Sequence, residues 1–429
     1  MLLGASEPDL DTLVRSYFLA ADHQRRDLLA AQIGTQLTGD LGALESSIQS
    51  MNIWPEVDEP IQHITQSAEG SGEVFVSLPN GYSPAKQIYP VVIALHGTGG
   101  SAAAVMRSSA VRFRRFLPEL IVAAPQSVEE DVFKFTEGEM NQPAHVLDML
   151  RRQYRIDNDR VFLTGYSKGG HATCMLALMF ADRWAGAIPL AGTVMFPRRE
   201  GIYRQVLGNV KHLPVLICWG ELDKLDGRGK PSPTGGIAGA NRKLSAVAAE
   251  MELPWTAVGL ADVGHGGVAP PADELGRILQ SRRARYPKNV SHRFKFPSQG
   301  SAYWLRLRRF IGEPWRDNRL VVKLKPGESR QAALDEGFSR RMGYLGGTIG
   351  RQTISITSRR AAEIELLLHD ELLSLNESIT IVYNGRKVFS GKIDPSAALM
   401  LEQAYRTRDF QRLFSARVIL PYRGKPRIE

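Results

Sequence analysis

The stretch that decides the fold is "DRVFLTGYSKGGHATCMLAL", residues 159–178, in which an apolar run changes its rhythm at a serine flanked by glycines. The residues before Ser167 are typical of a buried strand, and those from Lys168 to about Phe180 have a helical pattern. The run Gly165 to Gly169 fits G-x-S-x-G, in which a sharp strand-to-helix turn displays the serine. We therefore expect a displayed nucleophile; a plain turn that contains a serine is the alternative.

Strand and helix patterns alternate on both sides of this stretch. Expected strands outside it are residues 72–79, 89–97, 119–126, 184–192, 214–221 and 254–265, and expected helices are 141–157, with Asn141 as N-cap and Pro143 in the first turn, 240–251 and 272–286. Several of these strands are continuous apolar runs, which indicates burial on both faces. The alternation predicts an α/β fold with a mostly parallel sheet covered by helices on both sides.

The two ends of the chain have different patterns. Residues 1–70 are expected to be a helical region ending in a linker near 55–72, and 71–290 the α/β domain. Residues 291–429 are expected to form a β-rich domain, a sandwich with one helix within 397–414. Its expected strands are 292–296, 302–310, 319–325, 353–358, 363–369, 415–420 and the two of a hairpin over 378–393, which turns at Asn384-Gly385.

Composition sets wide bounds. The chain has 429 residues, of which 43% are hydrophobic and 23% charged, as in ordinary soluble globular proteins. Cys174 and Cys218 lie in apolar runs, so we expect buried free thiols and neither a disulfide nor a metal pair. No apolar run reaches the roughly 18–20 residues of a membrane span. The start is too short for a complete signal peptide, but export of a trimmed precursor stays an alternative, so the compartment is left open, as is the oligomeric state.

Positive charge is concentrated in one segment. The net charge is +9, and residues 282–325 hold thirteen Lys and Arg against Glu313 and Asp317. Such a stripe could bind an acidic polymer. Its basic residues alternate with aromatic and aliphatic ones, which favours strands with one solvated face. We therefore expect no nucleic-acid partner.

A serine nucleophile needs a base, and the base needs an acid that orients it. In a fold of this kind the acid and then the histidine follow the serine in the chain, each after a later strand. "PVLICWGELDKLDG" ends a strand and offers Glu221, Asp223 and Asp226. We favour Asp223, and the other two remain rivals.

His265 is the expected base. It ends a strand in "PWTAVGLADVGHGG" and has glycines on both sides. Of the nine histidines, it is the one that lies in a strand-end glycine loop downstream of the serine. Asp262, three residues earlier, is expected to tune this loop and not to be the acid.

An oxyanion hole requires two N–H groups aimed at the developing negative charge. One is expected from the main chain of Lys168, directly after the serine at a helix N-terminus. The other is expected from the loop "HGTGG", residues 96–100, with Thr98 favoured and Gly99 as the alternative. The same loop is a poor phosphate cradle, because it lacks the Lys-Ser/Thr of a P-loop and the third glycine of G-x-G-x-x-G.

Residues 72–285 resemble an α/β-hydrolase, since "HGTGG", "GYSKGG", "WGELD" and "GHGG" occur in that order. The region is similar to esterases of the polyhydroxyalkanoate-depolymerase-like and feruloyl-esterase-like types, and to the catalytic domains of prolyl-oligopeptidase-like peptidases. The resemblance implies a triad of Ser167, Asp223 and His265 and an oxyanion hole at Thr98 and Lys168. It departs from many relatives at Lys168, where they have Met, Gln or Ala; a cation there would favour acidic substrates.

The resulting expectation is a serine esterase that acts through an acyl-enzyme on short acyl or acylated-saccharide esters, without cofactor or metal. Only about 20 residues separate two of the strands, 184–192 and 214–221, which is short for a lid. An open cleft is therefore expected, with the N-terminal helices or the β-rich domain as a roof. The alternatives are a serine peptidase and a non-catalytic protein that binds acidic polymers.

Overall fold

The computed structural model describes residues 8–37, 41–66, 72–127, 136–197, 199–224, 230, 232, 235–316 and 319–428. The α-helices are α1 Leu10–Leu19, α2 His23–Gln36, α3 Gly42–Ser50, α4 Ala102–Phe113, α5 Glu137–Gln153, α6 Lys168–Met179, α7 Glu200–Leu207, α8 Gly236–Glu250, α9 Ala272–Ile278, α10 Arg330–Arg341 and α11 Ala397–Thr407. The short 3-10 helices are η1 Ala181–Arg183, η2 Gly208–Val210 and η3 Pro297–Gln299.

The strands fall into three sheets. They are β1 Ile61–Gln66, β2 Gly72–Ser77, β3 Tyr89–Leu95, β4 Ile121–Pro125, β5 Ile156–Tyr166, β6 Gly186–Leu190, β7 Val215–Gly220, β8 Trp255–Leu260, β9 Asn289–Phe294, β10 Ser301–Ala302, β11 Leu305–Phe310, β12 Gly343–Gly350, β13 Thr353–Arg359, β14 Ala361–Leu368, β15 Ile379–Tyr383, β16 Arg386–Gly391, β17 Ala416–Pro421 and β18 Arg427–Ile428.

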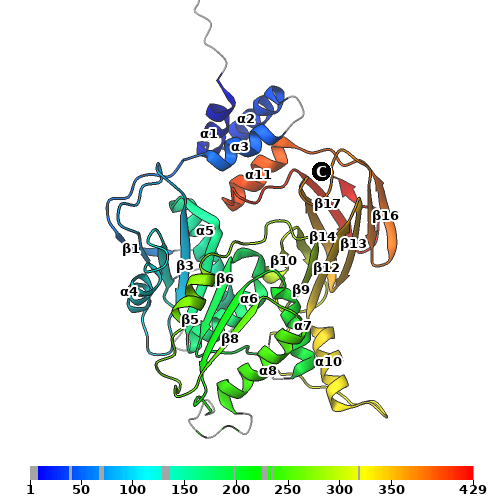
Figure 1. Ribbon diagram of the computed structural model, residues 1–429. Coiled ribbons are helices and arrows are strands. Elements are labelled where there is room, and N and C mark those ends of the chain that lie inside the picture. Colours follow the sequence, from blue (N-terminus) through cyan, green and yellow to red (C-terminus); the bar gives the residue numbers. More distant parts are fainter. Residues whose placement is uncertain are drawn as a thin grey trace, which may run out of the picture.

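The largest sheet has eight strands in the order β1-β2-β4-β3-β5-β6-β7-β8 (Figure 1). The strands from β4 to β8 in this order run parallel to one another, and β2 pairs antiparallel with both β1 and β4. Because parallel strands are joined by crossover helices, both faces of such a sheet are covered. The predicted α/β fold, with its mostly parallel sheet, is confirmed.

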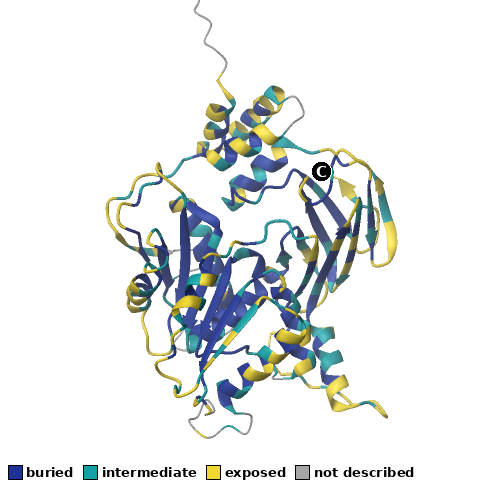
Figure 2. Ribbon diagram, viewed as in Figure 1, coloured by how far each residue is buried: buried dark blue, intermediate teal, exposed yellow. Residues whose placement is uncertain are grey.

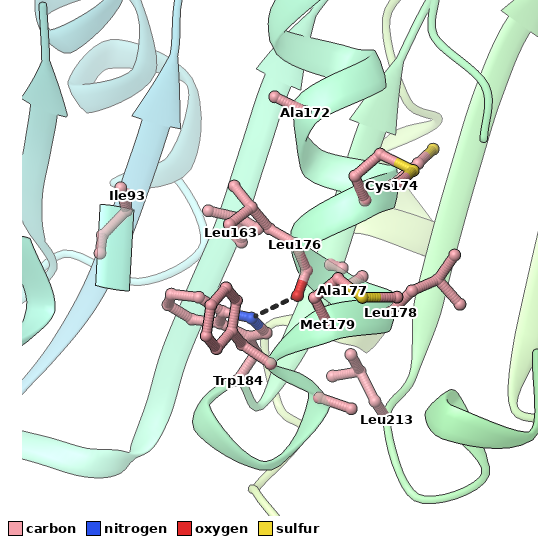
Figure 3. Close-up of a cluster of buried hydrophobic side chains, with 14 of the residues drawn as sticks. Ile93, Leu163, Ala172, Cys174, Leu176, Ala177, Leu178, Met179, Trp184 and Leu213 are labelled. Carbon is pink, nitrogen blue, oxygen red and sulfur yellow. Dashed lines mark hydrogen bonds between the residues drawn. The ribbon is translucent and has the colours of Figure 1, made fainter. Parts of the chain in front are cut away.

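Side chains of β5 alternate between two cores, one on each face of the sheet. Leu163 belongs to one apolar cluster and Phe162 to the other, and both are fully buried. Figure 2 shows the central strands buried along their lengths. On the Leu163 face, the indole of Trp184 donates a hydrogen bond of 3.3 Å to the carbonyl oxygen of Leu176, next to the end of α6 (Figure 3). This packing holds α6, and with it the serine at its start, against the sheet.

Two five-stranded sheets form the expected β-rich part. Their orders are β10-β11-β14-β17-β18 and β16-β15-β13-β12-β9, and they share a second apolar core. The hairpin at Asn384-Gly385 joins β15 to β16, as predicted. The expected strand at 319–325 was wrong: these residues are described and form neither strand nor helix. Strand β12 and helix α10 were not predicted.

Three further local predictions were wrong. Helix α5 begins at Glu137 with Thr136 as N-cap, so Asn141 is not a cap, and Pro143 lies inside the helix. A proline removes a single N–H, and the helix continues past it. The expected linker contains β1, which pairs with β2 at the sheet edge. Helix α9 ends at Ile278, well before residue 286.

Helices α1–α3 and the residues after α11 contact the α/β core near the end of β5 that lies opposite Ser167, whereas α10 packs on α7. Helices α1–α3 pack against α11 in one apolar cluster. At the start of β5, Asp159 accepts a hydrogen bond of 3.0 Å from Arg283, and Asn158 donates one of 2.7 Å to Gln411. Seven residues of extended strand, about 23 Å, separate Asp159 from Tyr166. The N-terminal helices thus lie away from the serine, while the expected roof by the β-rich part and the boundaries at residues 70 and 290 stay predictions.

Candidate active site

Ser167 occupies a strained turn between β5 and α6. Its φ of 57° and ψ of −115° lie where non-glycine residues are rare, at a cost of about 1–3 kcal/mol. A Cβ at Gly165 would overlap the carbonyl oxygen of Gly169, and a Cβ at Gly169 would overlap that of Leu95. The glycines thus allow α6 to start close to β3 and β5, and the turn directs Ser167 out of the sheet edge.

Three side chains from the ends of β5, β7 and β8 form a continuous hydrogen-bonded row. Ser167 Oγ lies 2.8 Å from Nε2 of His265, and Nδ1 of His265 lies 2.7 Å from Oδ2 of Asp223. The Asp223 side chain is only 7% exposed, whereas that of His265 is 48% exposed. A buried carboxylate on one ring nitrogen and a hydroxyl on the other is the arrangement that lets an imidazole take a serine proton.

The rival acids lie elsewhere or outside the described residues. Oε1 of Glu221 accepts a hydrogen bond of 3.0 Å from the indole of Trp219, and its Oε2 accepts one of 2.6 Å from Arg242. Asp262 is exposed on the loop before His265. Asp226 is not among the described residues. Of the described candidates, Asp223 is thus the one placed on the imidazole.

The loop His96–Gly100 lies against the strained turn. A Cβ at Gly97 would lie 3.0 Å from the carbonyl oxygen of Tyr166 and 3.3 Å from Cβ of Ser167. The N–H of Gly100 closes a turn on the carbonyl oxygen of Gly97 at 3.0 Å, with Thr98 exposed at its tip. Lys168 is the first residue of α6, where main-chain N–H groups point along the helix axis. Lys168 thus follows Ser167 directly and Thr98 is adjacent in sequence to Gly97, which lies against the turn; the role of the two residues as an oxyanion hole stays a prediction.

His96 fastens this loop to the end of β4, a role that the sequence pattern did not indicate. Its Nε2 accepts a hydrogen bond of 3.2 Å from the N–H of Ser127, which leaves Nδ1 as the donor to the carbonyl oxygen of Gly97 at 2.9 Å. Burial lowers the pKa of His96, so the neutral form that this bonding needs is favoured. The loop is thereby held in one orientation beside the serine.

Two further residues, Tyr166 and His171, make contacts around the turn. The hydroxyl of Tyr166 donates to the carbonyl oxygen of His265 at 2.5 Å. Nδ1 of His171 accepts a hydrogen bond of 2.8 Å from the N–H of Thr193, on the loop after β6. The two cysteines are buried free thiols, as expected, and burial raises the pKa of Cys218 to about 12.

The basic segment 282–325 is largely tied into the fold. Arg283 and Arg285 pair with Asp159, and Arg308 pairs with Glu363 at 3.3 Å. Within the described ranges, no group of three or more His, Cys, Asp or Glu side chains is arranged to hold a metal ion. No described helix is both long and apolar enough to cross a bilayer.

Comparison with known proteins finds similarity to hydrolases. A model of the prolyl oligopeptidase family matches residues 133–201. The chain is 28% identical over 206 residues, 45% of its length, to "Putative esterase NocK" of Nocardia uniformis subsp. tsuyamanensis. It is 30% identical over 134 residues, 29% of its length, to poly(3-hydroxyalkanoate) depolymerase C of Paucimonas lemoignei. An acetyl xylan esterase structure from Aspergillus awamori matches 51% of this chain and 99% of its own, at 15% identity and a TM-score of 0.40.

The matches cover parts of the relatives, 58% of the NocK protein and 32% of the depolymerase. They fall on the kinds of protein that the motifs resemble, namely depolymerase-like esterases and the prolyl oligopeptidase family. The parallel sheet and the strained serine turn between β5 and α6 agree with that resemblance. The chain has an α/β-hydrolase fold and is similar to serine esterases with that fold.

Proposed function

We propose that the chain is a serine carboxylic-ester hydrolase that acts through an acyl-enzyme on short acyl or acylated-saccharide esters. The observation that carries the proposal is the row Ser167–His265–Asp223, with separations of 2.8 and 2.7 Å. Each member comes from the carboxyl end of a different strand, in the chain order expected of this fold. The proposed chemistry needs no cofactor or metal.

In the first half-reaction, Ser167 Oγ attacks the ester carbonyl carbon while Nε2 of His265 takes the hydroxyl proton. Asp223 accepts a hydrogen bond from Nδ1–H and stabilises the imidazolium that forms. The N–H groups of Lys168 and Thr98 would donate hydrogen bonds to the carbonyl oxygen and stabilise its negative charge. The bond to the alcohol oxygen then breaks, His265 returns the proton to that oxygen, and the acyl group remains on Ser167.

The second half-reaction repeats these steps with water. His265 takes a proton from the water molecule as it attacks the acyl carbon, and the bond to Ser167 Oγ breaks. The proton passes to Oγ, which restores the serine and releases the carboxylic acid. Because both halves use the same charge stabilisation, one pair of N–H groups serves both.

The exposure of the residues around Ser167 supports ester substrates with a small or an extended acyl group. The His265 side chain is about half-exposed, and Thr98 lies at an exposed loop tip. The segment between β6 and β7 holds α7 and η2, which pack on the core. The depolymerase relative is named for a polyester, which favours esters over amides.

The second candidate is a serine peptidase, favoured by the match of residues 133–201 to the prolyl oligopeptidase family. Ester and amide hydrolysis share the nucleophile, and they differ in the leaving group that His265 must protonate. The row of three side chains therefore fits both, and substrate turnover distinguishes them.

The test is a panel of acetyl, butyryl and feruloyl esters, acetylated oligosaccharides and aminoacyl-arylamides, measured with wild type and Ser167→Ala. We expect ester turnover to dominate, and the substitution to lower it at least about 10⁴-fold. Dominant amide turnover would replace the esterase proposal by the peptidase. Ester turnover retained by a folded Ser167→Ala variant would overturn the mechanism.

A further inference from the structure

A cavity of about 360 Å³ lies where the α/β core meets the C-terminal sheets and α11. Its walls come from α5, η1 and β11, together with the segment from α11 to residue 412. It opens near the end of α6, whereas Ser167 precedes the start of that helix. The 12 residues of α6 span about 18 Å, so the cavity is separate from the proposed active site.

The lining of this cavity is strongly cationic. Its arginines are Arg151, Arg152, Arg183, Arg306, Arg406 and Arg412. Three aspartates, Asp148, Asp182 and Asp409, are the acidic residues in the lining. Six guanidinium groups against three carboxylates leave a formal excess of three positive charges in a confined space.

The three carboxylates are already engaged by arginine. Asp409 accepts hydrogen bonds from Arg283 on both oxygens, at 2.6 and 3.0 Å, and lies 3.5 Å from Arg151. Asp182 pairs with Arg412 at 2.9 Å. These two acids are therefore paired at short range with arginines that hold the fold together, Arg283 and Arg412.

Asp148 is likewise shared, lying 3.1 Å from Arg151 and 3.4 Å from Arg183. Each lining carboxylate is thus engaged at hydrogen-bonding or ion-pair distance by at least one guanidinium. Three lining arginines pair with none of these aspartates, namely Arg152, Arg306 and Arg406.

Arg306 has only weak charge compensation. Its Nη1 donates to the neutral amide of Gln403 at 2.8 Å, and its nearest carboxylate, Glu365, is 3.8 Å away. Glu365 is also shared with Arg308 and Arg417. Burial, reinforced by the positive charge of Arg412, lowers the pKa of Arg306 to about 10. A guanidinium held partly out of water gains most from an added anion.

Two exposed arginines stand at the cavity rim. Arg406, whose side chain is 67% exposed, lies 3.5 Å from Glu402 on the outer face of α11. Arg152 is exposed and donates to the carbonyl oxygen of Arg406 at 3.0 Å. Arg152 lies on α5 and Arg406 on α11, so two separate parts of the chain contribute to the rim.

We propose that this cavity binds a small polyanion through a phosphate or sulfate group. A tetrahedral oxyanion presents three or four oxygens to convergent guanidinium forks, whereas a carboxylate presents two. The volume suffices for such a group together with a small organic residue. An anion held by Arg306 and Arg406 bridges β11 and α11, which adds a contact at the junction of the core with the C-terminal part.

The test is calorimetric titration of the full chain with inorganic phosphate, pyrophosphate, sulfate and glycerol 2-phosphate, at constant ionic strength with chloride as reference. We expect saturable binding of at least one oxyanion. Phosphate against glycerol 2-phosphate separates a free anion from an esterified one, and either result supports the site. Because no ester is turned over, the outcome is independent of the proposed esterase activity.

Arg406→Gln and Arg340→Gln form a matched pair for this titration. Both arginines are 67% exposed and pair with a glutamate one helical turn earlier, but only Arg406 lines the cavity. We expect Arg406→Gln to weaken binding about tenfold, the loss of one charge-assisted hydrogen bond, and Arg340→Gln to leave it unchanged. Arg306→Gln should weaken it further. Absence of saturable binding up to about 10 mM, or equal affinities in the matched pair, would overturn the site.

Discussion

The hydroxyl of Tyr166 donates a hydrogen bond of 2.5 Å to the main-chain carbonyl oxygen of His265. The residue directly before the proposed nucleophile therefore holds the loop that carries the proposed base. The same hydroxyl lies 3.4 Å from the N–H of Val268, and the two rings meet edge to face with centroids 6.2 Å apart. Tyr166 is in this account a positioning residue, because it acts on the ester only through His265.

Replacement of Tyr166 by phenylalanine should lower kcat with little change in KM. Losing one such hydrogen bond costs about 1 kcal/mol, which corresponds to a fall of about fivefold in rate if the bond is needed to align His265. Steady-state kinetics on a p-nitrophenyl ester across pH measures the effect. Tyr383→Phe is the matched control, since it removes a tyrosine hydroxyl 2.8 Å from Ser358 Oγ in the C-terminal sheets. Equal kinetics for the two variants would contradict the positioning role.

Asp223→Asn should lower kcat by about 10⁴-fold, because an amide no longer holds the imidazole in the tautomer that accepts the serine proton. Glu221→Gln, two residues away, should leave kcat within about twofold, since its partners are Trp219 and Arg242. Initial rates on a short acyl ester, with circular dichroism as a folding check, compare them. A large loss in Glu221→Gln together with a mild one in Asp223→Asn would move the acid to Glu221.

The sequence pattern sufficed for the α/β sheet because its strands are marked locally. Strand β3 is a continuous apolar run that ends at the loop His96–Gly100, and all of its residues are buried. Strand β12 escaped notice because its four glycines in eight residues are typical of a turn. One of them makes space: a Cβ at Gly347 would lie 2.5 Å from Cη2 of Trp304. Such a requirement is visible only when a side chain distant in sequence is in place.

The candidate site likewise contains residues that could be predicted from the sequence and residues that could not. Ser167, Asp223 and His265 follow strands that the pattern located, so their meeting at one sheet edge could be predicted. Tyr166 could not be assigned, since the position before the serine carries no constraint in the motif. His96 lies in the loop that was expected to supply an oxyanion donor. Its hydrogen bond to Ser127, however, depends on the end of β4 lying next to β3. The periodicity of a segment does not show which strands lie next to it in the sheet.

Gly169→Ala should destabilise the protein by about 3 kcal/mol, because the added methyl overlaps the carbonyl oxygen of Leu95 and forces α6 away from β3. Gly34→Ala, in the last turn of α2 with no atom within 4 Å of the added Cβ, should stabilise by up to about 1 kcal/mol. Thermal unfolding followed by calorimetry ranks the two. Comparable melting temperatures for both variants would show that α6 does not start so close to β3.

The buried cluster around Asp409 should make the junction of the core with the C-terminal part sensitive to acid. Burial alone would raise the pKa of Asp409, but Arg283 and Arg151 outweigh it and hold the pKa well below its ordinary value. The folded-state pKa is depressed, so its stabilisation is present above about pH 4 and is lost as pH falls further. Asp409→Asn should cost about 3–5 kcal/mol at pH 7 and weaken the acid dependence.

Hydrogen exchange of the segments around residues 156–160 and 408–413, at pH 7 and at pH 3.5, measures this local stability. Asp262→Asn, at an exposed loop position, is the control and should match wild type. Unchanged protection of both segments in Asp409→Asn would contradict a structural role for the buried pairs.

The central claim, that Ser167 is a nucleophile activated by His265, is tested most directly by covalent labelling with a fluorophosphonate and peptide mass spectrometry. The account predicts one adduct per chain, located on Ser167, absent from Ser167→Ala and formed at least about 10³-fold more slowly in His265→Ala. Labelling at another residue, or equal labelling of a folded Ser167→Ala variant, would contradict it.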